Sequence, residues 1–116
     1  MYLIPLSSEP LQTQNFTHDG YDLTLTTRWN TIFGIWQFDL FDNIKQEYIV
    51  QSAAFTISSP SLMGSVLPFY FVMIDDAGLI NEPITKEDLG NRVNVYIVNK
   101  EEYRAAVRQS VSVNYR

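Results

Sequence analysis

The fold class follows from one stretch of the chain, 21-YDLTLTTRWN-30, in which apolar and polar residues alternate. Alternation with a period of two is typical of a β-strand that buries one face and exposes the other. The tripeptide 18-HDG-20 just before it has turn chemistry, since glycine adopts a positive φ at little cost. Because Phe16 precedes that turn, residues 14–27 are predicted to form a β-hairpin.

A second alternating stretch, 36-WQFDL-40, follows the first after a predicted turn over residues 30–34. Trp29 and Trp36 are therefore expected to lie near each other across this hairpin. A cross-strand aromatic pair of this kind stabilises a hairpin by roughly 0.2–1 kcal/mol.

Two more strands are predicted further along the chain. After a turn at residues 42–43, residues 47–57 are expected to form a strand with a bulge around residues 52–54. Residues 58–67 are rich in Ser, Pro and Gly, which is the composition of a loop. The continuous apolar run 69–74 predicts a strand that is buried on both faces or faces a partner subunit.

The N-terminal residues predict a strand at the edge of a sheet. Residues 2–6 are apolar, but Pro5 cannot donate a hydrogen bond to a central ladder. This segment is therefore an edge strand or an extended arm. Residues 7–14 are polar and are predicted to be a loop.

The C-terminal third predicts two helical segments around one strand. Residues 85–88 have the residue types of a helix start, and Gly90 would end that helix after about one turn. Residues 93–97 alternate again and predict a final core strand. Residues 101–109 contain Glu, Arg and Ala without Gly or Pro, which favours a helix.

These elements predict an all-β fold, mainly antiparallel. The expected architecture is a compact β-barrel or β-sandwich with one short helical turn and a helical C-terminal segment. A length of 116 residues indicates a single domain. Residues 1–100 are expected to form this domain, and residues 101–116 a C-terminal extension that is a candidate docking arm.

The bulk composition argues against several classes of function. The formal net charge of -5 argues against general nucleic-acid binding and against binding to anionic membrane surfaces. The absence of cysteine excludes disulfides, zinc sites with thiolate ligands and thiol nucleophiles. No apolar run approaches the length of a membrane span, and residues 1–10 lack the features of a signal peptide.

Residue types that carry catalysis or bind metals are sparse. His18 is the single histidine and is predicted to be a turn residue, because a catalytic histidine needs a nucleophile or an orienting carboxylate. The acidic residues at 42 and 75–76 are explained as turn formers, with a calcium site as a weaker alternative that lacks the EF-hand pattern. No catalytic, cofactor-binding or metal-binding residue is predicted, no cofactor is expected, and the chain is not expected to be an enzyme.

Aromatic residues offer an alternative function, a small β-sandwich module that binds carbohydrate or a protein ligand. Trp29, Trp36 and Tyr70 are the candidates for an exposed stacking surface. Both tryptophans fall in phase with apolar neighbours, which favours packing in the core over ligand binding. The binding module therefore ranks below a structural role, and an enzyme, or the small subunit of an enzyme, is the weakest of the three interpretations.

Four stretches, in this order, carry a resemblance to a known family: 4-IPL-6, 21-YDLTL-25 leading into 28-RWN-30, 34-GIWQFDL-40 and 85-TKEDLGNR-92. They resemble the small baseplate plug proteins of contractile-tailed phages, the cyanophage-type plug family. The resemblance covers residues 2–98 and rests on the order and spacing of these stretches.

The resemblance implies a structural virion protein at the junction between the tail tube and the baseplate hub. Such a protein would help plug the channel and join tube and baseplate. It would be made in the host cytoplasm and located in the tail baseplate. Its partners would be tube, hub and spike proteins and further copies of itself in a ring, without specific nucleic-acid binding and without a membrane.

Ring assembly needs exposed edges or apolar patches that become buried on contact. The N-terminal arm, the loop over residues 58–67 and the C-terminal segment are the natural places for such contacts. The candidate interface residues are Tyr2, Leu3, Ile4, Pro5, Leu62, Met63, Leu67, Tyr103, Arg104 and Arg108.

Overall fold

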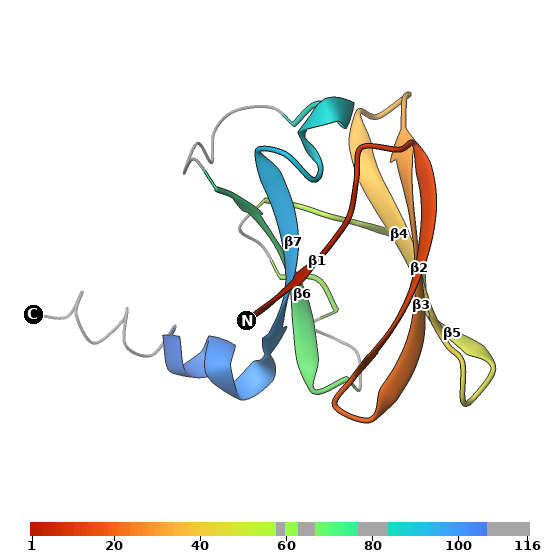
Figure 1. Ribbon diagram of the computed structural model, residues 1–116, viewed down its shortest axis with the longest axis vertical. Helices are drawn as coiled ribbons and strands as arrows, with labels where there is room; N and C mark the ends of the chain where they lie inside the picture. The colour runs from red at the N-terminus through yellow and green to blue at the C-terminus, as the bar shows by residue number, and fades with distance from the viewer. Residues whose placement is uncertain (58–59, 63–66, 77–83, 107–116) are drawn as a thin grey trace, which may run out of the picture.

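The computed structural model describes residues 1–57, 60–62, 67–76 and 84–106. Within these residues the chain forms two antiparallel β-sheets that lie face to face (Figure 1). The smaller sheet has the strand order β1–β7–β6 and the larger one the order β2–β3–β4–β5. The sheets do not close into a barrel, so the predicted all-β class is confirmed in the form of a sandwich.

The larger sheet consists of β2 (Leu11–His18), β3 (Tyr21–Asn30), β4 (Ile35–Asp42) and β5 (Glu47–Ala54). The predicted alternation sets its inner face, because Leu25 of β3 lies opposite Leu40 of β4, and both are buried. Thr27 and Phe38 form the next buried pair on the same face. The inner face of this sheet therefore comes directly from the period-two pattern.

The turn between β2 and β3 consists of two residues, Asp19 with φ 49° and Gly20 with φ 79°. Two consecutive positive φ angles are typical of the type I′ turn, whose twist matches that of the flanking strands. His18 was predicted to belong to the turn, but it is the last residue of β2 and pairs with Tyr21. The prediction of a loop over residues 7–14 is wrong from Leu11 onwards, because that residue begins the pairing with β3.

The smaller sheet consists of β1 (Tyr2–Ile4), β6 (Phe69–Asp75) and β7 (Val93–Asn99). β6 is buried on both faces, which is one of the two alternatives predicted for the apolar run 69–74. Phe71 belongs to the main core between the sheets, whereas Tyr70 packs on the outer side. There it meets Tyr103 from a helix that begins at residue 100 and extends through the described residues to 106, on the side away from the larger sheet (Figure 1).

Aromatic side chains from both sheets fill the core. Phe38 of the larger sheet stacks on Phe55 with ring centroids 4.3 Å apart, and it approaches Phe71 of the smaller sheet at 5.6 Å. Trp29 and Trp36 pair across their hairpin at 5.5 Å in an edge-on arrangement, which confirms their predicted proximity. Such edge-on pairs stabilise beyond the burial of apolar surface alone.

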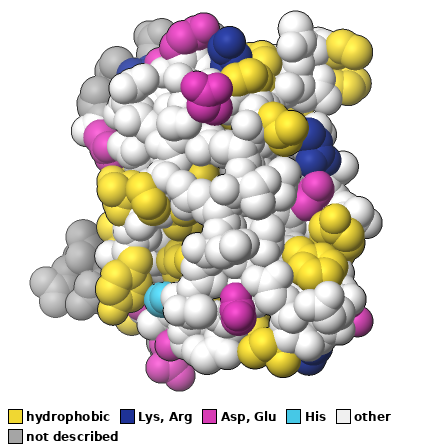
Figure 2. All heavy atoms as spheres, turned by 45° about the vertical axis from the view of Figure 1, so that its right-hand side comes forward, with side chains coloured by type: hydrophobic (Ala, Val, Ile, Leu, Met, Phe, Trp, Pro, Cys, Tyr) yellow, Lys and Arg dark blue, Asp and Glu magenta, His cyan; other side chains and the backbone are white. Residues whose placement is uncertain are grey.

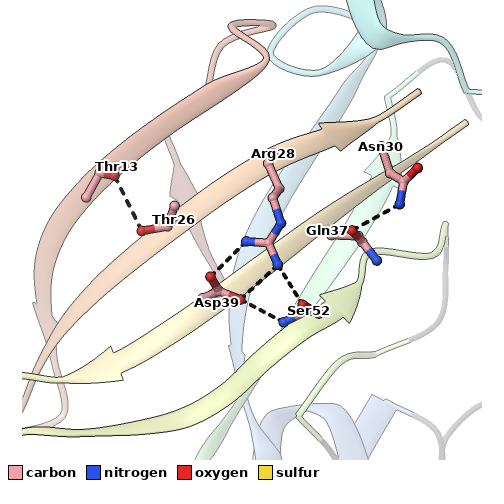
Figure 3. A network of polar contacts seen from close by, with 7 residues as sticks. All are labelled: Thr13, Thr26, Arg28, Asn30, Gln37, Asp39 and Ser52. Atoms are coloured by element: carbon pink, nitrogen blue, oxygen red, sulfur yellow. Dashed lines mark hydrogen bonds and ion pairs between the residues drawn. The ribbon is translucent and has the colours of Figure 1, made fainter. Parts of the chain in front are cut away.

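The outer face of the larger sheet is held by polar side chains (Figure 3). Asp39 accepts hydrogen bonds from the Arg28 guanidinium and from the backbone N–H of Ser52, the latter at 2.7 Å. Ser52 has a φ of 55°, and the β4–β5 register shifts at this point. The predicted bulge in β5 is therefore present, and the carboxylate of Asp39 satisfies the backbone donor that the bulge leaves without a ladder partner.

The predicted helical turn is the 3-10 helix η1 (Lys86–Asp88). The Asp88 carboxylate accepts the backbone N–H of Thr85 at 2.8 Å, which closes the first turn. Gly90 follows with a φ of 84° and lies against the backbone carbonyl of Leu6. This contact fixes the segment before β7 beside the residues that follow β1.

Candidate assembly surfaces

β1 lies at the edge of the smaller sheet and pairs with β7 alone among the described strands. Met1, Tyr2 and Leu3 are 60%, 62% and 53% exposed along this edge. Pro5 follows the strand and cannot extend its ladder. An apolar edge of this kind is a place where another chain can pair or pack.

His18 connects this edge to the core. Its ring makes edge-on contacts with Tyr2 at 5.3 Å and with Phe69 at 4.9 Å. Its Nε2 lies 3.2 Å from Oδ1 of Asn99 in β7. Because its contacts come from the smaller sheet, the histidine positions the exposed Tyr2 ring and links the edges of the two sheets.

A groove of about 310 Å³ runs between β1 and β2, where the edges of the two sheets remain apart. Its walls come from the two edge strands, chiefly from Tyr2, Leu3, Ile4, Gln14, Phe16 and His18. Gln14 donates a side-chain hydrogen bond to the carbonyl of Pro5 and so connects the two edges. In Figure 2 hydrophobic side chains gather beside the histidine that marks this side of the molecule. We call this feature the edge groove.

The turn between β3 and β4 carries two strongly exposed apolar side chains, Ile32 at 89% and Phe33 at 74%. Asn30 holds this turn, because its Oδ1 accepts the backbone N–H groups of Ile32 at 3.0 Å and Phe33 at 3.1 Å. The N–H of Gly34 closes the turn on the carbonyl of Asn30 at 2.8 Å. We call Ile32 and Phe33 the turn tip.

The turn between β4 and β5 repeats this construction at the other end of β4. Oδ1 of Asp42 accepts the N–H groups of Ile44 at 3.0 Å and Lys45 at 3.1 Å, and Gln46 donates to the carbonyl of Asp42 at 2.8 Å. Ile44 is 70% exposed and thus occupies the place that Ile32 has in the first turn. Since β4 joins the two turns, both ends of the larger sheet present an exposed isoleucine.

Sequence reasoning missed these turn residues. It identified residues 30–34 and 42–43 as turns but attached no role to the apolar residues inside them. The available signal is an Asn or Asp followed two residues later by isoleucine, as in Asn30–Ile32 and Asp42–Ile44. An Asn or Asp side chain can hydrogen-bond the backbone two residues further on, so this spacing marks an apolar residue inside a side-chain-capped turn.

The predicted interface residues lie in different environments. Leu62 and Leu67 are 9% and 0% exposed and belong to the core of this chain, so they are removed from the candidates. Ile4 is 4% exposed and also belongs to the core, and it takes part only as a buried residue that lines the edge groove. Their burial follows from packing between the sheets, which local hydrophobicity does not reveal. Met63 and Arg108 lie outside the described residues.

The remaining predicted residues are on the surface or close to it. Tyr2, Leu3 and Pro5 are exposed and line the edge groove. Tyr103 packs on Tyr70 at 5.4 Å, and Arg104 is exposed. Their role in assembly stays a prediction.

The aromatic residues considered for ligand stacking do not form an exposed platform. Trp36 is 1% and Tyr70 is 5% exposed, and Trp29 is half-buried against Trp36. The core interpretation of the tryptophans is therefore confirmed. A carbohydrate module built on these three side chains is not compatible with the structure.

Ionisable groups with shifted pKa values serve the fold. The hydrogen bond from Arg28 lowers the pKa of the Asp39 carboxyl, and the backbone hydrogen bond from Thr85 lowers that of Asp88. Burial, with Asp76 as hydrogen-bond partner, raises the pKa of the Tyr96 phenol. In the described part of the chain, no three His, Asp or Glu side chains come together as a metal site would require.

In the residues that the structure covers, no helix combines the length and the apolar composition that crossing a bilayer requires.

A known protein family matches most of this chain. Residues 1–101 match the family model described as cyanophage baseplate Pam3 plug gp18. No curated protein matches the chain. The family match spans both sheets and ends at the start of the C-terminal helix. The chain therefore belongs to the cyanophage baseplate plug family, as a structural protein of the virion baseplate that interacts with other baseplate proteins.

Proposed function

We propose that this chain is the plug at the junction between tail tube and baseplate hub. A ring of copies narrows the central channel there and joins tube to baseplate. The protein acts by binding its neighbours and has no catalytic step of its own. Family membership supports a baseplate role, and the finer position is our inference.

The observation that carries this proposal is the exposure of Ile32 and Ile44 at opposite ends of the larger sheet. A plug that works in a ring must contact a neighbouring copy of itself and a tube or hub protein through different surfaces. Exposed apolar residues on a rigid turn are typical of side chains that become buried on association. Both turns are held by an Asn or Asp side chain, so little conformational freedom would be lost on binding.

We assign the surface around Ile44 to a tube or hub protein. Beside this turn, Phe41 and Tyr48 pack edge-on with ring centroids 4.9 Å apart, and Tyr48 is 53% exposed. Aromatic residues are enriched in protein interfaces relative to the rest of the protein surface. Phe41, Ile44 and Tyr48 together form what we call the lower turn surface.

The segment after residue 100 is proposed as a docking arm. The family match ends at residue 101, so the rest of the chain lies beyond the part shared across the family. Tyr103 anchors the first helical turns on Tyr70, while Arg104 remains exposed for a neighbour. The N-terminal amine lies 3.3 Å from Glu102, which also holds this helix beside the domain.

A pull-down with the tube, hub and spike proteins of the same phage tests the proposal. We expect the full-length chain to retain both the tube and the hub protein. Ile44→Glu should weaken retention of one of them by roughly tenfold or more, since a charge enters an apolar contact. Leu11→Glu is the matched control, because Leu11 is 66% exposed but lies on β2, outside both turns. Failure of the wild-type chain to retain either protein would refute the proposed position.

A further inference from the structure

The turn tip combines large apolar surface with a fixed shape. Ile32 and Phe33 project from a five-residue turn whose backbone donors are satisfied by Asn30. An aromatic side chain of this exposure offers roughly 150–250 Å² of surface to a partner. Leaving such a pair in water is unfavourable, so the turn tip is suited to insertion into an apolar site.

The edge groove offers a site of matching chemistry on the same chain. The residues that line it include no Asp, Glu, Lys or Arg, although the whole chain contains 13 acidic residues. Its volume of about 310 Å³ is at the lower end of the range for sites that enclose an apolar group. Tyr2 and Leu3 at its rim are exposed and available to close over an inserted side chain.

The turn tip cannot fill the edge groove of its own chain. The N–H of Trp29 donates to the carbonyl of Pro10, so the start of β2 lies beside the β3–β4 turn. The groove is lined by the other half of β2, from Gln14 to His18. The tip and the groove are thus separate surfaces of one molecule, and a contact between them has to join two molecules.

We propose that copies of this chain assemble through the turn tip of one copy inserted into the edge groove of the next. This inference rests on the proposed function as a ring-forming plug and names the contact that builds the ring. Because the two surfaces differ, the contact is heterologous, and such contacts form a closed ring when the rotation between copies closes. Each copy in the ring then uses both of its surfaces.

The size of the contact predicts how assembly depends on concentration. Two apolar side chains cover far less than the about 800 Å² per partner of a standard stable interface. A single pair of copies is therefore weak. Ring closure gives every copy two contacts at once, so monomer and complete ring should dominate over open intermediates.

Native mass spectrometry and analytical ultracentrifugation of the full-length chain test the contact. Wild-type protein is expected to form a closed ring of uniform mass. Phe33→Glu, in the tip, and Leu3→Glu, in the groove, should each abolish the ring, with at least a tenfold loss of oligomer at equal concentration. Both positions are exposed, so unchanged thermal unfolding and circular dichroism are expected to show that the fold is intact.

Mixing the two variants gives the sharpest result. Phe33→Glu keeps an intact groove and Leu3→Glu keeps an intact tip, so an equimolar mixture at high protein concentration should form heterodimers through this one weak contact and stop there. Ile44→Glu is the matched control, because it places the same charge on the equivalent turn and should leave the ring unchanged.

Three outcomes would overturn the inference: a ring that survives Phe33→Glu, a mixture without heterodimers even at high protein concentration, or wild-type protein that stays monomeric both alone and when bound to the hub protein. In each case retention of tube and hub proteins is measured separately. A ring that forms despite the tip or groove substitution, with intact retention, would reject this contact and leave the proposed function standing. Loss of retention with an intact ring would reject the proposed joining of tube and hub alone.

Discussion

Arg28 of β3 and Asp39 of β4 form a bidentate ion pair on the outer face of the larger sheet (Figure 3). Nη1 of the arginine donates to Oδ2 at 2.7 Å and Nη2 to Oδ1 at 3.2 Å. The carboxylate also accepts the N–H of Ser52, so one side chain connects three strands. The hydrogen bond from Arg28 is the main reason that the pKa of Asp39 lies below its ordinary value of 3.8.

Asp39 should stabilise the fold at neutral pH and lose this effect in acid. Its pKa is lower in the folded than in the unfolded chain, so the stabilisation is complete above the ordinary value and disappears as the pH falls through the lowered one. Asp39→Asn is expected to reduce the free energy of unfolding by up to about 1 kcal/mol at neutral pH. Urea denaturation of wild type and Asp39→Asn measures the difference in unfolding free energy at neutral pH and at a pH well below the folded pKa of Asp39. An equal loss of stability at the two pH values would contradict the prediction.

Arg92 pairs with a carboxylate in a different environment. Its Nη1 lies 3.0 Å from Oδ2 of Asp75, whose side chain is 0% exposed. Removing a cationic partner from a buried carboxylate is costly, so Arg92→Met should destabilise the protein by about 3 kcal/mol. Arg28→Met at the more exposed pair should cost about 1 kcal/mol or less. Chemical denaturation gives the unfolding free energy of both variants. Similar losses of stability would show that burial of the carboxylate does not determine the cost of removing its arginine.

Gly34 and Gly90 should respond differently to the same substitution. Both have positive φ, 65° and 84°, but a Cβ at Gly34 would meet no atom within 4 Å, whereas at Gly90 it would collide with the backbone of Leu6. Gly34→Ala is expected to cost about 1 kcal/mol from the backbone conformation alone. Gly90→Ala should cost about 1–3 kcal/mol more, because packed backbone must move. Thermal unfolding of the pair tests this, and Gly34→Asn should recover part of the smaller loss.

Thr27 is a buried polar residue whose replacement should stabilise the fold. It is 0% exposed, and its Oγ1 finds no hydrogen-bond partner among the described residues. Thr27→Val keeps the β-branched shape and removes the buried hydroxyl, so a gain of about 1 kcal/mol is expected. Thr26→Val is the control, since Thr26 points to the other face and contacts Thr13 at 3.4 Å. A loss of stability in Thr27→Val would falsify the claim of an unsatisfied hydroxyl.

Much of the strand content was predictable from local pattern. The alternation around Leu23, Leu25 and Trp36 gave the inner face of the larger sheet, and the apolar run at 69–74 gave a strand buried on both sides. The start of β2 was missed, because Gln12 and Gln14 occupy the inward positions of an edge strand and hide its alternation. A polar edge strand and a polar loop have the same composition.

The sequence alone predicted poorly which apolar residues form the candidate assembly surfaces. Ile4 and Leu67 were expected at an interface but are buried, while Ile32 and Phe33 were left without a role but are exposed. Hydrophobicity is the same in both cases. Only the position of each residue relative to the second sheet separates them.

The amino-acid sequence by itself determined the all-β class, most strand positions and the bulge near Ser52, because these depend on residues close together in the chain. It also determined the family resemblance, which depends on the order and spacing of stretches along the whole chain and on no contact between them. The tertiary structure decided which apolar side chains remain in water and where the edge groove lies. His18 shows the reason, since its partner Asn99 is 81 positions away. Burial and grooves arise from contacts between distant segments, and no local pattern contains that information.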